Sequence, residues 1–299
     1  MVKITAVIIT QNEARNIGRC LQSLQDIADE VVVVDSGSTD ATEQICVSFN
    51  VRFTPHPWEG YDGQKNFADT LASHDWILSI DADEALSPAL QTSLRDFKNG
   101  SPADNEVFSV CRLNNYCGSW IHHCGWYPDE KVRLWRKGVA SWDGVVHEEI
   151  RYDRPVIKKR LAGDLLHYTY YSVADHAARQ VKYATLAAQK AHQQGRKCRR
   201  CTLALKPLWT FLRNYIFKGG FLDGRAGFLV CKMSAFYTLV KYAKLNELSN
   251  NPIYSGKSFP IFPSQQCFNF YTCCYTFYIS NHMHHFCIWS IKIMHLMLN

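Results

Sequence analysis

The sequence predicts an α/β protein whose central sheet has mostly parallel strands, followed by a helical C-terminal region. Apolar runs of strand length alternate with segments of helical periodicity through the first third of the chain, which is typical of a layered parallel sheet. One run, Glu30–Asp35, holds four consecutive valines, as expected for a strand buried on both faces. From Ser172 to Gln194 the pattern is helical only, and Gly195 ends it.

Four strands are predicted in the first part of the chain, at Ile4–Thr10, Glu30–Asp35, residues 51–55 and residues 76–80. The helix after the first strand is indicated by apolar residues at helical spacing from Ile17 to Ile27. The next helix is expected to begin at Asp40, whose carboxylate can accept hydrogen bonds from the free amides of a first turn. Residues 64–73 predict a third helix. In such a sheet, ligands bind at the carboxyl ends of the strands.

After the fourth strand, the sequence predicts one more helix and then a less regular group of strands. Ser87 and Pro88 have the pattern of an N-cap and a first-turn proline, and apolar residues at helical spacing follow them. Shorter strands are expected at residues 107–113 and 131–136. We interpret this stretch as the mixed second half of the same domain.

The predicted domains are an α/β domain at residues 1–168, a basic helical region at 169–248 and a tail at 249–299. In the helical region, residues 208–217 predict a basic amphipathic helix. Lys206 and Arg213 lie opposite its apolar face, which consists of Leu208, Phe211, Leu212, Tyr215 and Ile216. The tail has no Asp or Glu but four Cys and four His. Its composition favours a frameshifted or non-native segment, and the alternative is a segment that contacts a membrane.

Charge is distributed unevenly along the chain. Residues 1–150 carry 12 Lys and Arg against 22 Asp and Glu, whereas residues 151–248 carry 19 against 5. A basic segment attracts nucleic acid, anionic lipid or a phosphorylated substrate without distinguishing them. The N-terminus has the pattern of a strand and not of an export signal, so the 12 cysteines are expected to remain thiols in the cytosol. No window offers about 18 uninterrupted apolar residues, so no membrane-spanning helix is predicted.

Two carboxylates, Asp81 and Asp83, directly follow the fourth predicted strand. Side chains two residues apart at a strand end can converge on one hard divalent cation, which prefers oxygen ligands and can bridge a diphosphate. Such a metal neutralises charge on a departing nucleoside diphosphate. Isolated pairs of this spacing are mostly solvated loop acids, but the position of this one after three strand–helix units favours a metal site.

Another carboxylate, Asp35, ends the valine-rich strand and precedes a turn of small residues at positions 36–40. At that place a carboxylate can bind the imide group of a uracil or a ribose hydroxyl. Turn and capping chemistry alone can also explain the segment, and that explanation fits Asp40.

Short motifs follow three of the predicted strands: TQNEA at residues 10–14, DSGSTD at 35–40 and DADE at 81–84. They resemble motifs of the family 2 glycosyltransferases, which have the GT-A fold. More narrowly, QKNFA at 64–68, RLWR at 133–136, VHE at 146–148 and GFLDG at 220–224 resemble the bacterial lipopolysaccharide core glucosyltransferases that act on the first heptose. The resemblance covers about residues 1–248, and its front motifs are shared by the whole superfamily.

The resemblance implies an inverting, metal-dependent transferase that moves a hexose, glucose from UDP-glucose, onto a heptose of the lipopolysaccharide inner core. It also implies Mg²⁺ or Mn²⁺ as the cofactor and a lipid A-core acceptor. The basic amphipathic helix at 208–217 favours a cytoplasmic enzyme held peripherally on the inner face of the inner membrane, and the alternative is that this helix packs its apolar face on the catalytic domain. The donor-binding residues that it implies are Thr10, Glu13, Asp35, Lys65 and Asp81. Asp83 is the expected metal ligand, and His147 is a second candidate.

An inverting transferase needs a base that takes the proton of the acceptor hydroxyl. Glu148 is the first candidate, because the acidic base motif of the superfamily is expected after the strand that contains Arg133. Asp129 and Glu130 are the alternatives. This part of the chain lacks the clear Glu-Asp pair that many relatives carry.

Other classes agree less well with the residues. The turn after the first strand has no glycine, which argues against a dinucleotide-binding motif. A nucleotidyltransferase shares the α/β layout and the metal-bound Asp, but its Gly-rich basic N-terminal loop is absent. A nucleic-acid-binding protein is the non-enzyme alternative; the basic segment supports it and the acidic first half opposes it. A glycosyltransferase that acts on another envelope glycan or lipid acceptor stays open.

Overall fold

The computed structural model describes residues 1–144, 149–198 and 200–250. Residues 1–250 form one compact unit. Of the expected tail, only residues 249 and 250 are described, and they end the last helix. The eight cysteines in the described ranges are all free thiols. No helix within these ranges is both long enough and apolar enough to span a bilayer.

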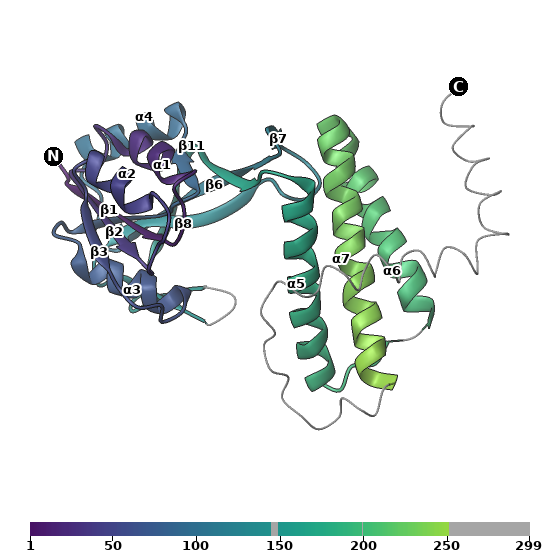
Figure 1. The fold of residues 1–299 in the computed structure, drawn as a ribbon. Coiled ribbons are helices and arrows are strands. Elements are labelled where there is room, and N and C mark those ends of the chain that lie inside the picture. The colour runs from purple at the N-terminus through teal and green to yellow at the C-terminus, as the bar shows by residue number, and fades with distance from the viewer. Residues whose placement is uncertain (145–148, 199, 251–299) are drawn as a thin grey trace. The chain divides into compact units, whose positions relative to one another are not determined.

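Nine strands of the described chain form one sheet, in the order β3-β2-β1-β4-β8-β6-β11-β5 with β7 beside β6. Figure 1 shows the strands among helices α1 to α4. The first four strands are parallel: β1 (Ile4–Thr10), β2 (Glu30–Asp35), β3 (Arg52–Pro55) and β4 (Trp76–Asp81). The others are β5 (Glu84–Leu86), β6 (Glu106–Tyr116), β7 (Ser119–Ile121), β8 (Asp129–Arg136) and β11 (Ile157–Tyr170). Strands β6 and β11 are parallel to each other, while β8, β5 and β7 are antiparallel to their neighbours. The expected sheet of mostly parallel strands is confirmed.

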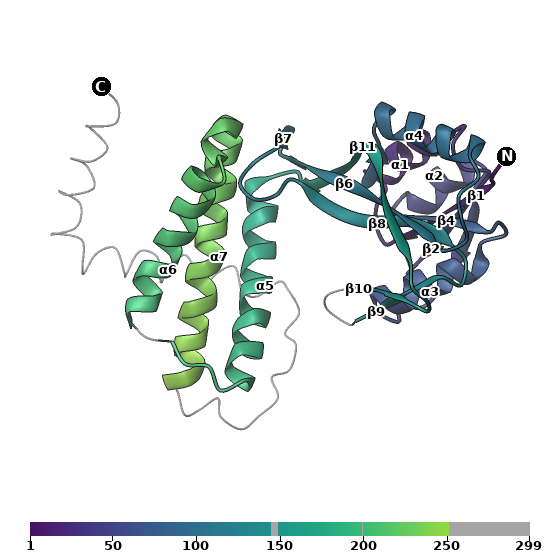
Figure 2. The ribbon, with the colours of Figure 1, turned by 180° about the vertical axis from the view of Figure 1, so that it is seen from behind.

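Helices cover both faces of the sheet, as the two opposite views in Figures 1 and 2 show. One apolar cluster joins the sheet to α1 (Ile17–Leu24), α2 (Thr42–Ser48) and α4 (Pro88–Asn99). A second cluster joins it to α3 (Tyr61–Leu71) and to a small separate sheet made of β9 (Ala140–Asp143) and β10 (Glu149–Tyr152).

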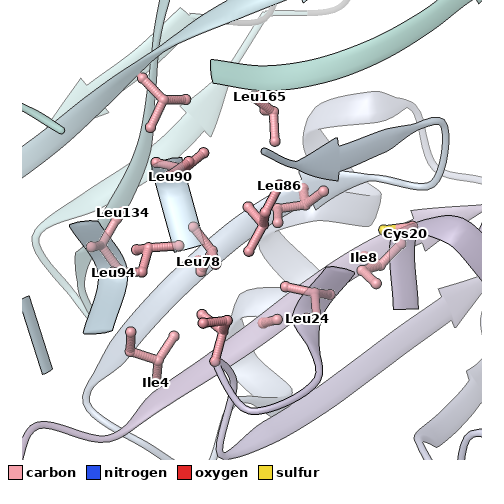
Figure 3. Close-up of a cluster of buried hydrophobic side chains, with 14 of the residues drawn as sticks. Ile4, Ile8, Cys20, Leu24, Leu78, Leu86, Leu90, Leu94, Leu134 and Leu165 are labelled. Atoms are coloured by element: carbon pink, nitrogen blue, oxygen red, sulfur yellow. The ribbon is translucent and has the colours of Figure 1, made fainter. Parts of the chain in front are cut away.

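Figure 3 shows the first cluster, in which Ile8 of β1 lies among leucines from the helices and neighbouring strands. The preceding residue, Val7, belongs to the second cluster. Successive side chains of a strand point to opposite faces of the sheet, so both positions must be apolar when helices cover both faces. This explains the uninterrupted apolar runs in the sequence.

The side chains expected to cap α4 and α2 both bind backbone amides near the starts of these helices. Ser87 Oγ accepts the backbone N–H of Leu90 at 3.3 Å, as predicted for the start of α4. Helix α2 begins at Thr42 and not at Asp40, but Asp40 Oδ1 still accepts the Thr42 N–H at 3.0 Å. Its other oxygen accepts the N–H of Ala14, also at 3.0 Å. Asp40 therefore serves the first turn of α2 and also ties the loop after β1 to it.

The C-terminal region consists of helices, as expected. They are α5 (Val173–Gln193), α6 (Arg200–Leu212), the π-helical turn η1 (Arg213–Phe217), the 3₁₀ turn η2 (Gly220–Asp223) and α7 (Gly224–Asn250). The helix expected at 208–217 is therefore the end of α6 followed by η1.

The single apolar face predicted for residues 208–217 is wrong. Phe211 and Tyr215 pack on a buried cluster, whereas Leu208 and Ile216 are exposed. The π-helical turn begins at Arg213 and adds a residue to the helical repeat, so Ile216 no longer follows the 3.6-residue period of α6.

The strands and the C-terminal helices share part of their core. Tyr116 of β6 and Tyr170 of β11 are buried together with Val230 and Cys231 of α7. Strand β11 also extends two residues past the boundary expected at 168. The helical region is thus packed directly against the ends of the longest strands.

Candidate active site

A cleft of about 1080 Å³ opens where the carboxyl ends of β1 and β4 meet the start of β8 and the end of β11. Because parallel strands end at the same edge of a sheet, residues far apart in the sequence converge there. The cleft walls include six of the residues selected from the sequence: Thr10, Glu13, Lys65, Asp81, Asp83 and Glu130.

Asp81 belongs to a network of ion pairs at the end of β4. Its Oδ1 atom lies 3.0 Å from Lys65 Nζ, and its Oδ2 atom accepts a 2.8 Å hydrogen bond from Arg133 Nη2. The same Nη2 atom donates to Glu84 Oε1 at 2.7 Å, and Glu84 Oε2 accepts the backbone N–H of Asp81 at 3.0 Å. Arg133 and Glu84 are buried. The network holds the Asp81 carboxylate in one orientation at the cleft wall.

The reach of Arg133 depends on an irregularity in the pairing of β8 with β6. Leu134 pairs with Phe108, but the next pair joins Val132 to Ser109, so Arg133 is the extra residue of a bulge. A bulge bends its strand and redirects the side chain at that position. Here it directs a guanidinium toward Asp81, which ends β4, and Glu84, which begins β5.

Charge pairing decides how these acids are protonated. Burial by itself raises the pKa of the Asp81 carboxyl, but the positive charges of Lys65 and Arg133 outweigh it and hold that pKa well below its usual range. For Glu84 burial prevails, and its pKa is raised although Arg133 acts in the opposite direction. Asp81 is therefore an anion throughout the physiological pH range.

Asp83 faces a histidine that the sequence analysis did not select. His167 Nε2 lies 3.1 Å from Asp83 Oδ2. The other ring nitrogen, Nδ1, donates to Asn114 Oδ1 at 2.7 Å, and the hydroxyl of Thr169 donates to the same oxygen at 3.0 Å. When the ring carries its proton on Nδ1, the lone pair of Nε2 faces the carboxylate.

The Asp83–His167 pair fits part of the shell of a divalent cation. Two lone pairs at 3.1 Å repel each other unless a ring proton or a metal ion lies between them. In nucleotide sites Mg²⁺ takes one or two carboxylates from the protein and completes its shell with phosphate oxygens and water. Within the described ranges, no group of three or more His, Cys, Asp and Glu side chains is arranged to hold a metal. The pair therefore suits a metal that a phosphate ligand shares.

The end of β1 and the loop that follows it bring Thr10 and Glu13 to the cleft. Thr10 is buried, and no group of the described residues lies within hydrogen-bond distance of its Oγ1. Glu13 accepts a 2.7 Å hydrogen bond from Asn16, and burial raises the pKa of its carboxyl. Thr10 and Glu13 thus form the part of the cleft wall at the end of β1.

The QKNFA motif connects three parts of the site. Gln64 donates to the hydroxyl of Ser36 at 2.6 Å, in the turn after β2. Lys65 is buried between Asp81 and the ring of Trp142, whose centroid lies 4.3 Å from Nζ. Asn66 exchanges two 2.8 Å hydrogen bonds with the backbone of Trp142. The motif thus positions a lysine and the indole beside it.

Asp35 is not among the cleft walls. Its Oδ2 atom accepts the backbone N–H groups of Gly37 and Ser38 at 2.9 and 2.8 Å, and Oδ1 accepts the Ser38 hydroxyl at 2.5 Å. The carboxylate therefore shapes the turn after β2. Its role in binding uracil stays a prediction.

The two alternative bases differ in their surroundings. Asp129 accepts a hydrogen bond from Arg112 Nε at 2.9 Å and lies 3.0 Å from Lys131 Nζ. Burial raises the pKa of Asp129, but these cations outweigh it and lower the pKa overall, which weakens the carboxylate as a base. Asp129 is not among the cleft walls, whereas the exposed side chain of Glu130 is. Of these two, the geometry favours Glu130.

Two further candidates, His147 and Glu148, lie outside the described residues. Their roles as metal ligand and base stay predictions.

Comparisons with known proteins assign the family. The family model of glycosyl transferase family 2 matches residues 5–138. Over 256 residues the chain is 34% identical to the lipopolysaccharide core biosynthesis glycosyltransferase LpsC of Rhizobium meliloti, covering 81% of this chain and 91% of that protein. The chain belongs to glycosyl transferase family 2. This glycosyltransferase is also 34% identical over 256 residues to an uncharacterized glycosyltransferase of Rickettsia bellii, covering 83% of this chain and 87% of that protein.

Among solved structures, the glycosyltransferase is similar to glucosyl-3-phosphoglycerate synthase from Mycobacterium tuberculosis in complex with Mn²⁺, UDP and glucosyl-3-phosphoglycerate. The identity is 22% and the TM-score 0.31, over 38% of this chain and 44% of that one. A similarity this low does not show which metal or substrate this chain binds. The family expected from the motifs is confirmed by the sequence relatives, and the expected α/β architecture by the sheet itself.

His167 was missed because nothing in its sequence spacing relates it to Asp83. The pairing of β11 with β5 places His167 opposite Glu84, which is the residue after Asp83. One local signal was present, since His167 and Thr169 are two residues apart and so share a face at the end of a strand.

Proposed function

We propose that this glycosyltransferase is an inverting hexosyltransferase that moves glucose from UDP-glucose onto a heptose of the lipopolysaccharide inner core. The observation that carries the proposal is the meeting of Asp83 and His167 beside the Asp81–Lys65 ion pair in one cleft. A departing nucleoside diphosphate needs a cation and fixed positive charge, and these side chains are suited to supply both. The name of the relative LpsC supports the lipopolysaccharide core as the acceptor.

In this proposal the donor lies along the ends of β1 and β4. Thr10 and Glu13 bind the nucleoside, and Asp35 binds the uracil. Lys65 and Asp81 bind the sugar and diphosphate side of the donor. The lowered pKa of Asp81 supports this role, because an ionised carboxylate accepts hydrogen bonds from hydroxyl groups most strongly.

Asp83 and His167 hold Mg²⁺ or Mn²⁺ in the proposal, and His147 stays a further candidate ligand. When bound, such a metal acts as a Lewis acid that offsets the charge developing on UDP. The protein's own contribution is orientation. Asn114 fixes the proton on Nδ1 of His167 and so keeps Nε2 available toward Asp83.

Inversion follows from a single displacement at the anomeric carbon. The acceptor oxygen forms a bond to that carbon while the bond to the UDP oxygen breaks, and a base takes the hydroxyl proton. We propose Glu148 for the base. Glu130 is the alternative that the cleft geometry supports.

The cleft also fits an anionic acceptor. Beyond the residues assigned to the donor, its walls carry the cations Arg112, Lys131, Lys158 and Arg179. A lipid A-core acceptor is phosphorylated and embedded in a membrane, so we place the enzyme peripherally on the cytoplasmic face of the inner membrane.

A donor and acceptor screen tests the proposal. The purified chain is incubated with Mg²⁺ or Mn²⁺, a set of UDP- and GDP-sugars and lipopolysaccharides truncated at successive core sugars. UDP release and product mass are measured. We expect acceptor-dependent release from UDP-glucose and a product that is one hexose heavier.

Other outcomes would point to other functions. Pyrophosphate release from a nucleoside triphosphate and a sugar phosphate would indicate a nucleotidyltransferase. Transfer only to a different envelope glycan or lipid would replace the acceptor. A nucleic-acid gel shift that UDP-glucose does not compete would support the non-enzyme alternative.

A further inference from the structure

Large apolar side chains are exposed on the consecutive elements α6, η1 and η2. The densest group lies between positions 216 and 222, where Phe217 is 71% and Leu222 62% exposed. We call the full set the α6–η2 apolar surface; it consists of Leu205, Leu208, Trp209, Ile216, Phe217, Phe221 and Leu222. The rings of Trp209 and Phe217 are 5.9 Å apart, which joins the α6 part of this surface to the η1 part.

The other side of the same segment already has a protein partner. Phe211 and Tyr215 stack with their ring centroids 5.2 Å apart and pack against the buried cluster that contains Val230 of α7. A helical segment with apolar side chains on both sides needs a second partner.

Exposed cations accompany the apolar side chains along this segment and the start of α7. They are Lys206, Arg213, Lys218, Arg225 and Lys232. Between positions 201 and 246 the sequence has a single acid, Asp223. Its side chain is 4% exposed and accepts the backbone N–H of His123 at 2.8 Å. The segment thus presents cations and apolar groups without an accessible carboxylate.

We propose that the α6–η2 apolar surface inserts into the interfacial region of an anionic phospholipid bilayer. Its aromatic and aliphatic side chains lie at the boundary between headgroups and acyl chains, and Lys206 and Arg213 contact lipid phosphates. This contact would bring the cleft to a lipid-linked acceptor, and this part of the inference rests on the proposed function.

A second copy of the chain is a less suitable occupant of this surface. A symmetric contact would bring the same five cations against themselves, and like charges across an interface are unfavourable. A bilayer that contains anionic lipid provides apolar volume and the opposite charge together.

Vesicle flotation of the full chain tests the proposal. The vesicles contain phosphatidylcholine alone or with phosphatidylglycerol, without lipopolysaccharide or donor, at about 0.15 M and about 1 M NaCl. We expect binding to the anionic vesicles that weakens at high salt but persists, because insertion of apolar groups is not screened. Phe217→Ser and Leu222→Ser should each raise the lipid concentration for half-maximal binding about tenfold. The double variant Lys206→Gln/Arg213→Gln should lose mainly the part of vesicle binding that high salt weakens.

The matched control is Val47→Ser on α2, because Val47 is 66% exposed and lies outside the surface. It should bind as the wild type does. Wild-type binding by both Phe217→Ser and Leu222→Ser would overturn the proposal, and so would a wild-type chain that does not float. If light scattering then shows a dimer that these variants dissociate, the surface belongs to a second copy. Flotation uses neither substrate, so its outcome is independent of the transferase assay.

Discussion

Asn114 on β6 holds His167 against Asp83 by accepting a hydrogen bond from the ring nitrogen on the opposite side. The arrangement fixes the rotation of the imidazole and favours a proton on Nδ1, because Asn114 Oδ1 can only accept a hydrogen bond. Histidine ligands of metals are commonly oriented by such an acceptor. The metal assignment can therefore be tested at Asp83, at His167 and at Asn114.

Asp83→Ala should lower kcat about a hundredfold, because a main electrostatic stabiliser of the leaving group is lost. His167→Ala should also lower the activity, because it weakens activation by Mn²⁺. UDP release measured against metal concentration checks both variants, with His192→Ala on the last turn of α5 as a control. Full activity of Asp83→Ala in the presence of a chelator would rule out its assignment.

Asn114→Leu tests positioning separately from ligation. The ring of His167 would lose its oriented tautomer, so the metal concentration for half-maximal activity should rise about tenfold to a hundredfold. At saturating metal, kcat should largely recover, which a general loss of structure would not allow. Asn115→Ala is the control, since neighbouring residues of a strand point to opposite faces. Equal effects of the two variants would argue against positioning.

Arg133→Met should destabilise the fold by about 3 kcal/mol, because it removes the hydrogen-bonded cation of the buried Glu84 and leaves it only Arg112, at 3.7 Å. The double variant Arg133→Met/Glu84→Gln should recover part of this loss. Arg136→Met is the matched control on the same strand, since its partners Asp75 and Asp104 are exposed, and it should cost less than about 1 kcal/mol. Urea unfolding measures all three. Equal losses for Arg133→Met and Arg136→Met would contradict the importance of the buried network.

Three variants test the base: Glu148→Gln, Glu130→Gln and Asp129→Asn. Each keeps the volume of the side chain but removes its ability to take a proton. The variant that removes the base should lower kcat while the affinity for UDP-glucose changes little. We expect this pattern for Glu148→Gln. Calorimetry and single-turnover transfer measure the two quantities. If Glu130→Gln shows the pattern instead, the role moves to the residue that lines the described cleft.

His176 predicts how stability depends on pH. Its buried ring stacks on Tyr170 with centroids 4.1 Å apart, and burial lowers its pKa to about 4. Between about pH 6.5 and pH 4 the unfolded chain therefore binds a proton that the folded chain excludes, so stability falls as the pH decreases. His176→Phe should reduce the loss of unfolding free energy between about pH 7 and pH 5 by about 2 kcal/mol. An unchanged pH dependence would show that His176 does not contribute.

Some site positions were accessible from the sequence because their cause is local. Asp81 and Asp83 follow an apolar run of strand length, and both line the cleft. Asp35 follows an equally clear strand, yet its carboxylate is bound to its own turn. A strand end predicts the edge of the sheet on which a residue lies, but not the direction of its side chain.

The alternation of strands and helices from β1 to β4 and the acids at positions 81 and 83 were determined by the sequence alone, because apolar periodicity, capping residues and strand ends are properties of neighbouring residues. Only the tertiary structure decided that His167 faces Asp83, since this depends on β11 pairing beside β5. The reach of Arg133 and the exposure of Ile216 likewise depend on a bulge and a π-helical turn. Each of these irregularities inserts one extra residue into a strand or helix. The regular periods of two and 3.6 residues that are assumed from a sequence do not show where such a residue lies.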